Sequence, residues 1–135
     1  MKQADKEKLL NLLRQYEELR VNEQIDYDKF YLYSIITHST AIEGSTVTEL
    51  EAQLLFDEGI TSNKRTMIEQ LMNLDLKVAY DFGMKWIQQH EKITVDNLIL
   101  LASKVMARTG SEYHTMVGDF SAARGELRKL NVTAG

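Results

Sequence analysis

The sequence predicts an all-α protein, a multi-helix bundle with a short β-strand at the carboxyl end. Apolar residues recur at intervals of three and four along most of the chain, which is the spacing of amphipathic helices. The 135 residues contain no proline, although average usage is about 5%, and this absence favours long uninterrupted helices. With 44% hydrophobic residues, a chain of this length can form one core, so we expect a single domain spanning 1–135.

The first two helices are recognised by their apolar spacing and by the residues at their ends. An amphipathic helix lies within 1–26, and a second helix begins near Asp26, a favourable N-cap residue. We expect the second helix to stop just after Glu43, because Gly44 readily adopts the left-handed conformation that ends helices. The apolar face of the first helix comprises Leu9, Leu12, Leu13, Tyr16 and Leu19, and the second helix is expected to bury Phe30, Tyr33 or Leu32, Ile36 and Thr40.

Three further helices and an extended segment follow. Thr48 and Glu51 form a capping box at the start of a short helix that ends at Gly59. We expect a long helix over 63–90, with Gly83 as its weak point, and another over 94–110. From residue 111 the helical period is lost, which predicts a loop and then a strand over 127–133. The expected core residues are Met67, Leu71, Leu74, Val78, Phe82 and Trp86 in the long helix and Val95, Leu98, Ala102, Val105 and Met106 in the next.

Charge and composition exclude several classes of function. The chain has 16 basic and 20 acidic residues, so no positive field gathers nucleic acid or an anionic membrane. Segment 49–71 has the outline of a helix-turn-helix, but Leu55 and Arg65 stand where that motif needs a small and a buried apolar residue. The charged amino end lacks the apolar stretch of a secretory signal, and no apolar run is long enough to cross a bilayer. We expect a cytoplasmic protein without nucleic-acid or membrane partners.

The residues offer no recognisable catalytic centre of their own. The absence of cysteine removes thiolate catalysis and cysteine-based zinc sites. His38, His90 and His114 are too scattered for a metal site, and the glycines form no phosphate-binding loop. The serines fall on helices or at their ends, where capping and surface roles are typical. We therefore assign no catalytic residue and no metal ligand.

Two segments resemble motifs of the Fic-domain family, enzymes that usually transfer AMP from ATP to a hydroxyl side chain of a target protein. Residues 39–44 read STAIEG and resemble the family's inhibitory motif S/T-x-x-x-E-G/N. Residues 125–132 read GELRKLNV and resemble the G-x-Y/F/L-R-x-x-x-V segment that opens the family's flap hairpin. Residues 106–118 are similar to bacterial members. The resemblance covers 27–135, with the inhibitory helix at 27–44 and the flap beginning at 125–135.

The resemblance implies a Fic-like bundle, ATP and Mg²⁺ as cofactors of the complete enzyme, and roles for particular residues. Glu43 would pair with the second arginine of the family's catalytic signature, so that the γ-phosphate of ATP cannot take its productive place. Ser39 would form hydrogen bonds within the same site, and Gly44 would end the helix and keep the carboxylate at its tip. The flap would align a target Tyr, Ser or Thr by strand addition, through Gly125, Arg128, Leu130, Asn131, Val132 and Thr133.

The catalytic signature H-P-F-x-x-G-N-G-R-x-x-R does not occur in this sequence. We therefore expect that the chain alone neither catalyses nor binds ATP well, and that it is the amino-terminal part of an autoinhibited adenylyltransferase or a product that lost its catalytic half. An unpaired flap edge also predicts self-association. The alternative is a free-standing, antitoxin-like helical binding module that offers its Glu43 helix to a separate catalytic protein. A helical domain whose motif matches are accidental is a third interpretation.

Overall fold

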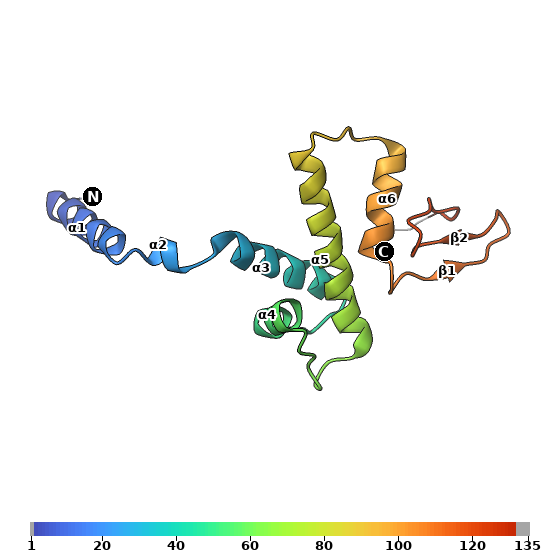
Figure 1. The fold of residues 1–135 in the computed structure, drawn as a ribbon, viewed down its shortest axis with the longest axis horizontal. Helices are drawn as coiled ribbons and strands as arrows, with labels where there is room; N and C mark the ends of the chain where they lie inside the picture. The colour runs from blue at the N-terminus through green and yellow to red at the C-terminus, as the bar shows by residue number, and fades with distance from the viewer. Residues whose placement is uncertain (1, 132–135) are drawn as a thin grey trace. The chain divides into compact units, whose positions relative to one another are not determined.

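The computed structural model describes residues 2–131 and confirms the all-α class with a small β element near the carboxyl end (Figure 1). Over these residues the helices are α1 (Gln3–Glu18), α2 (Val21–Gln24), α3 (Tyr27–Ile42), α4 (Glu49–Glu58), α5 (Met67–Gln88) and α6 (Val95–Val105), and the strands are β1 (Glu112–Tyr113) and β2 (Phe120–Ser121). None of these helices is both long and apolar enough to cross a membrane.

The chain divides into two compact units, residues 1–34 and 35–135, with the division inside α3. The first unit contains α1, whose predicted apolar face lies exposed. In the same unit the hydroxyl oxygens of Tyr16 and Tyr27 are 3.0 Å apart, at hydrogen-bond distance. The second unit contains most of the buried residues and both segments that resemble Fic motifs.

Helix α3 ends as the sequence predicts. Its last helical residue is Ile42, Glu43 follows as the C-cap, and Gly44 has a left-handed φ of 95°. Tyr33, Ile36 and Thr40 are buried, as expected. Phe30 is 53% exposed, so its predicted burial is wrong. Phe30 lies in the first unit, one turn before the buried face of α3 begins at Tyr33.

Helices α4 and α5 begin with capping boxes. Thr48 and Glu51 cap α4, which ends at Gly59, and both predictions are confirmed. Helix α5 begins at Met67, four residues later than predicted from Asn63, because Thr66 and Glu69 form its capping box. Helix α5 continues without interruption through the predicted weak point at residue 83.

The predicted core faces of α5 and α6 are wrong, since none of the predicted residues is buried and only Leu71, Leu74, Phe82 and Trp86 are half-buried. Met67 and Val78 are exposed, because the buried face of α5 consists of Gln70, Asn73, Asp75 and Ala79. Thr94 caps α6 as predicted, but the helix ends at Val105 and not at residue 110. No residue of α6 is buried. The exposed residues among its expected core set are Val95, Leu98, Ala102, Val105 and Met106.

Strands β1 and β2 form an antiparallel hairpin in the stretch predicted to be a loop. Glu112 pairs with Ser121 and Tyr113 with Phe120, whose rings stack with centroids 4.7 Å apart. The strand predicted over 127–133 is not found over 127–131, where the backbone has no regular structure, and 132 and 133 lie outside the described residues. Strand pairing therefore occurs earlier in the chain than the alternation of residues predicts.

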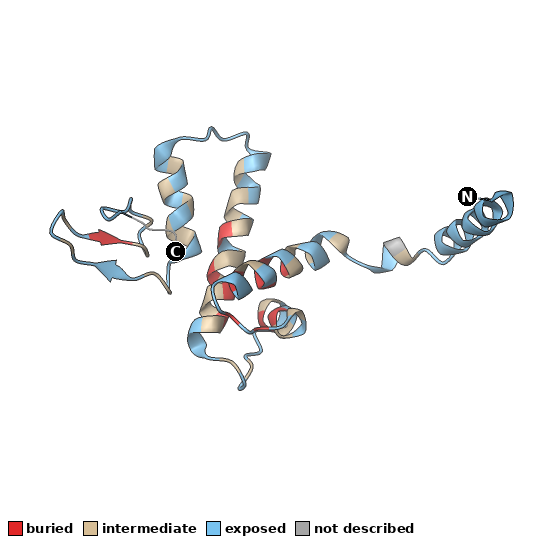
Figure 2. Ribbon diagram, turned by 180° about the vertical axis from the view of Figure 1, so that it is seen from behind, coloured by how far each residue is buried: buried red, intermediate tan, exposed pale blue. Residues whose placement is uncertain are grey.

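Burial is concentrated where α3, α4 and α5 meet, with a second small site on β2 (Figure 2). Half of the buried positions are polar, since Thr37, Thr40, Ser45, Gln70, Asn73, Asp75 and Ser121 accompany Tyr33, Ile36, Val47, Ala52, Leu55, Ala79 and Phe120. Within the described residues every buried side-chain nitrogen or oxygen has a hydrogen-bond partner. Hydrogen bonds thus determine the geometry of this core as much as apolar packing does.

Candidate functional site

Residues 40–46, referred to below as the Glu43 turn, join α3 to the segment before α4. The Thr40 carbonyl accepts the Glu43 N–H at 3.0 Å and the Ser45 N–H at 3.1 Å. The Ala41 carbonyl accepts the Gly44 N–H at 3.0 Å. This pairing, with left-handed Gly44, is a Schellman motif. The Glu43 side chain is exposed, and its carboxylate makes no hydrogen bond or ion pair with any described residue.

The amide of Asn73 on α5 lies beneath the Glu43 turn. Asn73 is fully buried. Its Nδ2 donates to Ser45 Oγ at 3.2 Å and to the Glu69 carbonyl at 2.9 Å, while Thr40 Oγ1 donates to its Oδ1 at 3.1 Å. Asn73 therefore joins residues on both sides of Glu43 to one position on α5.

The Glu69 carboxylate holds the far end of the same turn. Its Oε1 accepts the Thr46 N–H at 2.8 Å and the Thr46 hydroxyl at 2.6 Å, and its Oε2 accepts the Thr66 N–H at 2.8 Å. The Thr46 hydroxyl, then the Thr66 backbone N–H, lower the pKa of Glu69 to about 2. Glu69 is thus ionised at neutral pH and acts as an acceptor for both segments.

Glu51 on α4 forms a similar junction with the segment before α5. The Thr48 backbone N–H, then the Arg65 guanidinium, lower the pKa of Glu51 to about 2. Arg65 Nε lies 2.8 Å from Glu51 Oε2, and Arg65 Nη1 donates to Thr46 Oγ1 at 3.1 Å. The Glu43 turn is therefore connected to α4 and α5 through charged hydrogen bonds.

A pocket of about 300 Å³ lies beside the Glu43 turn. Its walls come from one face of α3 and from residues 45–49, and His38 Nδ1 lies 3.6 Å from Glu49 Oε1. Hydroxyl groups of Thr37, Ser45, Thr46 and Thr48 belong to the lining residues. The hydroxyls of Ser45, Thr46 and Thr48 already form hydrogen bonds within the protein. An unpaired carboxylate such as that of Glu43 can pair with a cationic group brought to it.

The predicted flap residues lie away from the Glu43 turn. Figure 1 shows the hairpin and the segment after it on the α6 side of α5, and the end of α3 on its other side. A Cβ on Gly125 would collide with the Ile99 carbonyl oxygen and lie 2.6 Å from the Ser103 nitrogen, both on α6. Gly125 therefore fixes the start of the flap segment. Arg128, Leu130 and Asn131 are exposed, and Val132 and Thr133 lie outside the described residues.

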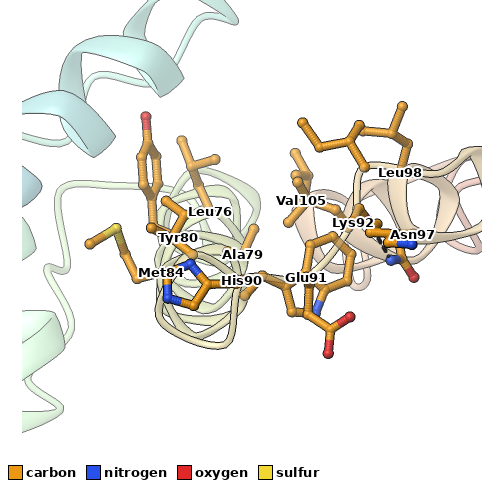
Figure 3. Close-up of a pocket in the computed structure, with 15 residues that line it drawn as sticks. Leu76, Ala79, Tyr80, Met84, His90, Glu91, Lys92, Asn97, Leu98 and Val105 are labelled. Atoms are coloured by element: carbon orange, nitrogen blue, oxygen red, sulfur yellow. Dashed lines mark hydrogen bonds between the residues drawn. The ribbon is translucent and has the colours of Figure 1, made fainter.

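A larger apolar groove of about 740 Å³ separates α5 from α6 (Figure 3). Leu76 and Tyr80 of α5 and Leu98 and Val105 of α6 are among its lining residues. At one end the Asn97 side chain donates to the Lys92 carbonyl at 2.8 Å. The groove can accept apolar side chains, and its lining also includes the titratable residues His90, Glu91 and Lys92.

The sequence predicts the helix end at Gly44 but not the residues that hold the Glu43 turn in place. The spacing of Thr66 and Glu69 is that of a capping box and marks the start of α5. No comparable signal marks Asn73, because a polar residue on an amphipathic helix is expected to face water. Comparison of the chain with protein-family models, curated proteins and solved structures finds no match.

Proposed function

We propose that the chain is the regulatory and scaffold part of a Fic-type protein adenylyltransferase, in which Glu43 is the inhibitory carboxylate. One observation supports this most directly: the Glu43 carboxylate is exposed and unpaired among the described residues, although hydrogen bonds fix the backbone on both sides of it. A carboxylate at a helix C-terminus is opposed by the helix dipole. Its position therefore fits a group kept for a cationic partner, here the arginine of the catalytic signature.

The proposal gives this chain a regulatory role and no catalytic one. Within the described residues no group of three or more histidine, aspartate or glutamate side chains is placed to hold a metal ion. In this proposal ATP and Mg²⁺ would be held by the catalytic signature of the complete enzyme. Glu43 withholds an arginine of that signature, Ser39 supports the same site from one turn earlier on α3, and Gly44 ends the helix.

The flap segment is proposed to position the target. The close contact of Gly125 with α6 supports this, because it anchors one end of a segment whose following residues are exposed. Exposed backbone over 127–131 can add an extended target segment as a strand. The expected target is a protein with an accessible Tyr, Ser or Thr hydroxyl. The flap segment of a second copy of this chain would compete with the target for the same edge.

The test measures label incorporation from ATP by the full-length natural protein. Replacing Glu43 by glycine should raise AMP transfer about 10- to 100-fold, the effect of losing one hydrogen-bonded ionic contact. Glu58→Gly is the matched control, because Glu58 is also exposed and precedes a left-handed glycine, Gly59, at the end of α4. Glu58→Gly should leave transfer unchanged.

Equal label incorporation by the wild type and the Glu43→Gly variant would overturn the assignment. If the natural protein has the 15.5 kDa mass of this chain and transfers no label, the free-standing binding module becomes the better description. In that case Glu43→Gly should change only the activity of a separate catalytic protein added to it.

A further inference from the structure

We infer that Asn73 is the positioning residue that keeps Glu43 in its inhibitory place, an inference that rests on the proposed function. Asn73 lies 30 residues after Glu43 in the sequence, on a different helix, and is fully buried. Two of its three side-chain hydrogen bonds go to the Glu43 turn, at Thr40 and Ser45, and the third goes to the Glu69 carbonyl on its own helix.

The contacts of Asn73 bracket Glu43. Thr40 precedes Glu43 by three residues and Ser45 follows it by two, and the Ser45 N–H donates to the Thr40 carbonyl at 3.1 Å. The two contacted residues are therefore hydrogen-bonded to each other as well as to Asn73. This closed set determines where the C-cap of α3, and with it the Glu43 carboxylate, lies relative to α5.

Apolar packing contributes little to holding the turn. Ile42, the residue before Glu43, is 84% exposed, and Ala41 is also exposed. The buried residues of the turn, Thr40 and Ser45, are both polar. Leaving a buried polar group without its hydrogen-bond partner costs free energy. Removal of the Asn73 amide should therefore destabilise the turn.

The rest of the junction does not depend on Asn73. Glu69 holds Thr46 through two hydrogen bonds, and Glu51 is paired with Arg65. The buried apolar residues Ile36, Ala52 and Leu55 all lie outside the Glu43 turn. Loss of the Asn73 contacts therefore loosens the turn at Thr40 and Ser45, while Glu69 still holds Thr46 and α4 and α5 stay joined.

The experiment uses two variants that weaken the contact in different ways. Asn73→Ala removes the amide, and Thr40→Val removes one hydroxyl at nearly constant volume, with Thr40→Ser as the version that keeps the hydroxyl. Asp75→Asn is the matched control, because Asp75 is buried on the same helix but binds Arg108 and not the Glu43 turn.

Two measurements are made on the full-length protein: amide hydrogen exchange at Gly44 and Ser45, and AMP transfer. Asn73→Ala and Thr40→Val should each accelerate exchange at these amides by about tenfold and raise AMP transfer, whereas Thr40→Ser and Asp75→Asn should do neither. In a Glu43→Gly background, Asn73→Ala should add no further activation.

The outcomes separate this inference from the proposed function. If Glu43→Gly activates the enzyme but Asn73→Ala and Thr40→Val accelerate exchange without raising transfer, the positioning role of Asn73 is overturned and the proposed function stands. Additional activation by Asn73→Ala in the Glu43→Gly background overturns it as well, since Asn73 would then act by another route. If Glu43→Gly itself does not activate, the proposed function fails, and the inhibitory role of Asn73 fails with it.

Discussion

At the scale of single residues, two glycines with the same backbone conformation differ in their surroundings. Gly59 and Gly125 both have a φ of 69°. Nothing lies within 4 Å of a Cβ built on Gly59, whereas one built on Gly125 would meet the backbone of α6 at Ile99 and Ser103. The pair therefore separates the cost of a left-handed conformation from the cost of a close approach between backbones.

Gly59→Ala should destabilise the fold by about 1–2 kcal/mol, the cost of left-handed backbone for a residue with a Cβ. Gly125→Ala should cost more than this, because the added methyl group cannot fit without moving the hairpin from α6. Urea unfolding followed by the fluorescence of the single tryptophan, Trp86, measures both free energies of unfolding. Equal losses in the two variants would show that the close approach at Gly125 contributes nothing.

At the scale of secondary-structure elements, one buried carboxylate ties α5 to the turn after α6. Asp75 is 1% exposed, and its two oxygens accept the Arg108 backbone N–H at 2.8 Å and the Arg108 Nε–H at 2.6 Å. Asp81, on the same helix, forms an exposed pair with Lys77 at 2.7 Å. The two aspartates offer a comparison of a buried and an exposed ionic contact.

Asp75→Asn should lower the free energy of unfolding by about 2 kcal/mol, because a buried carboxylate loses its charged contact with Arg108. Asp81→Asn should cost less than about 0.5 kcal/mol, as expected of an exposed pair within one helix. Thermal unfolding of both variants provides the comparison. A loss for Asp75→Asn as small as that for Asp81→Asn would contradict the structural role given to Arg108.

Local signals in the sequence predicted the ends of elements better than their buried faces. The Thr48 capping box, the Thr94 cap and the Schellman end at Gly44 depend only on residues a few positions apart, and all three are confirmed. Burial of Asn73 and Asp75 depends on partners about 30 residues away, such as Thr40 and Arg108. No helical period reports such contacts, so the position of Glu43 at a helix end was predictable and the buried partners of the turn were not.

At the scale of the whole molecule, two carboxylates join α3, α4 and α5, and both have a pKa of about 2, lowered from 4.5. A group whose pKa is lower in the folded state stabilises the fold above its unfolded pKa and loses this contribution as pH falls toward its folded pKa. Stability should therefore fall between about pH 4.5 and 2.

Replacing Glu51 and Glu69 together by glutamine should lower stability at neutral pH and flatten its dependence on pH over this acidic range. Urea unfolding at several pH values, with the wild type measured in parallel, checks this slope. An unchanged slope in the double variant would mean that acid acts on other groups.

The backbone lies against its neighbours at Gly110 and Gly125, so an inserted tag is better placed elsewhere in the hairpin. A Cβ on Gly110 would meet the backbone at Ala122 and Ala123, and the Ala122 N–H donates to the Ser111 carbonyl at 3.0 Å, so the two arms of the hairpin are joined at its base. Its far end is open to solvent, and Met116 is 106% exposed. Lengthening a loop whose ends are already joined costs only about 0.6 kcal/mol per doubling. A fluorophore or short peptide tag inserted at Met116 therefore leaves the core intact while it reports on the hairpin.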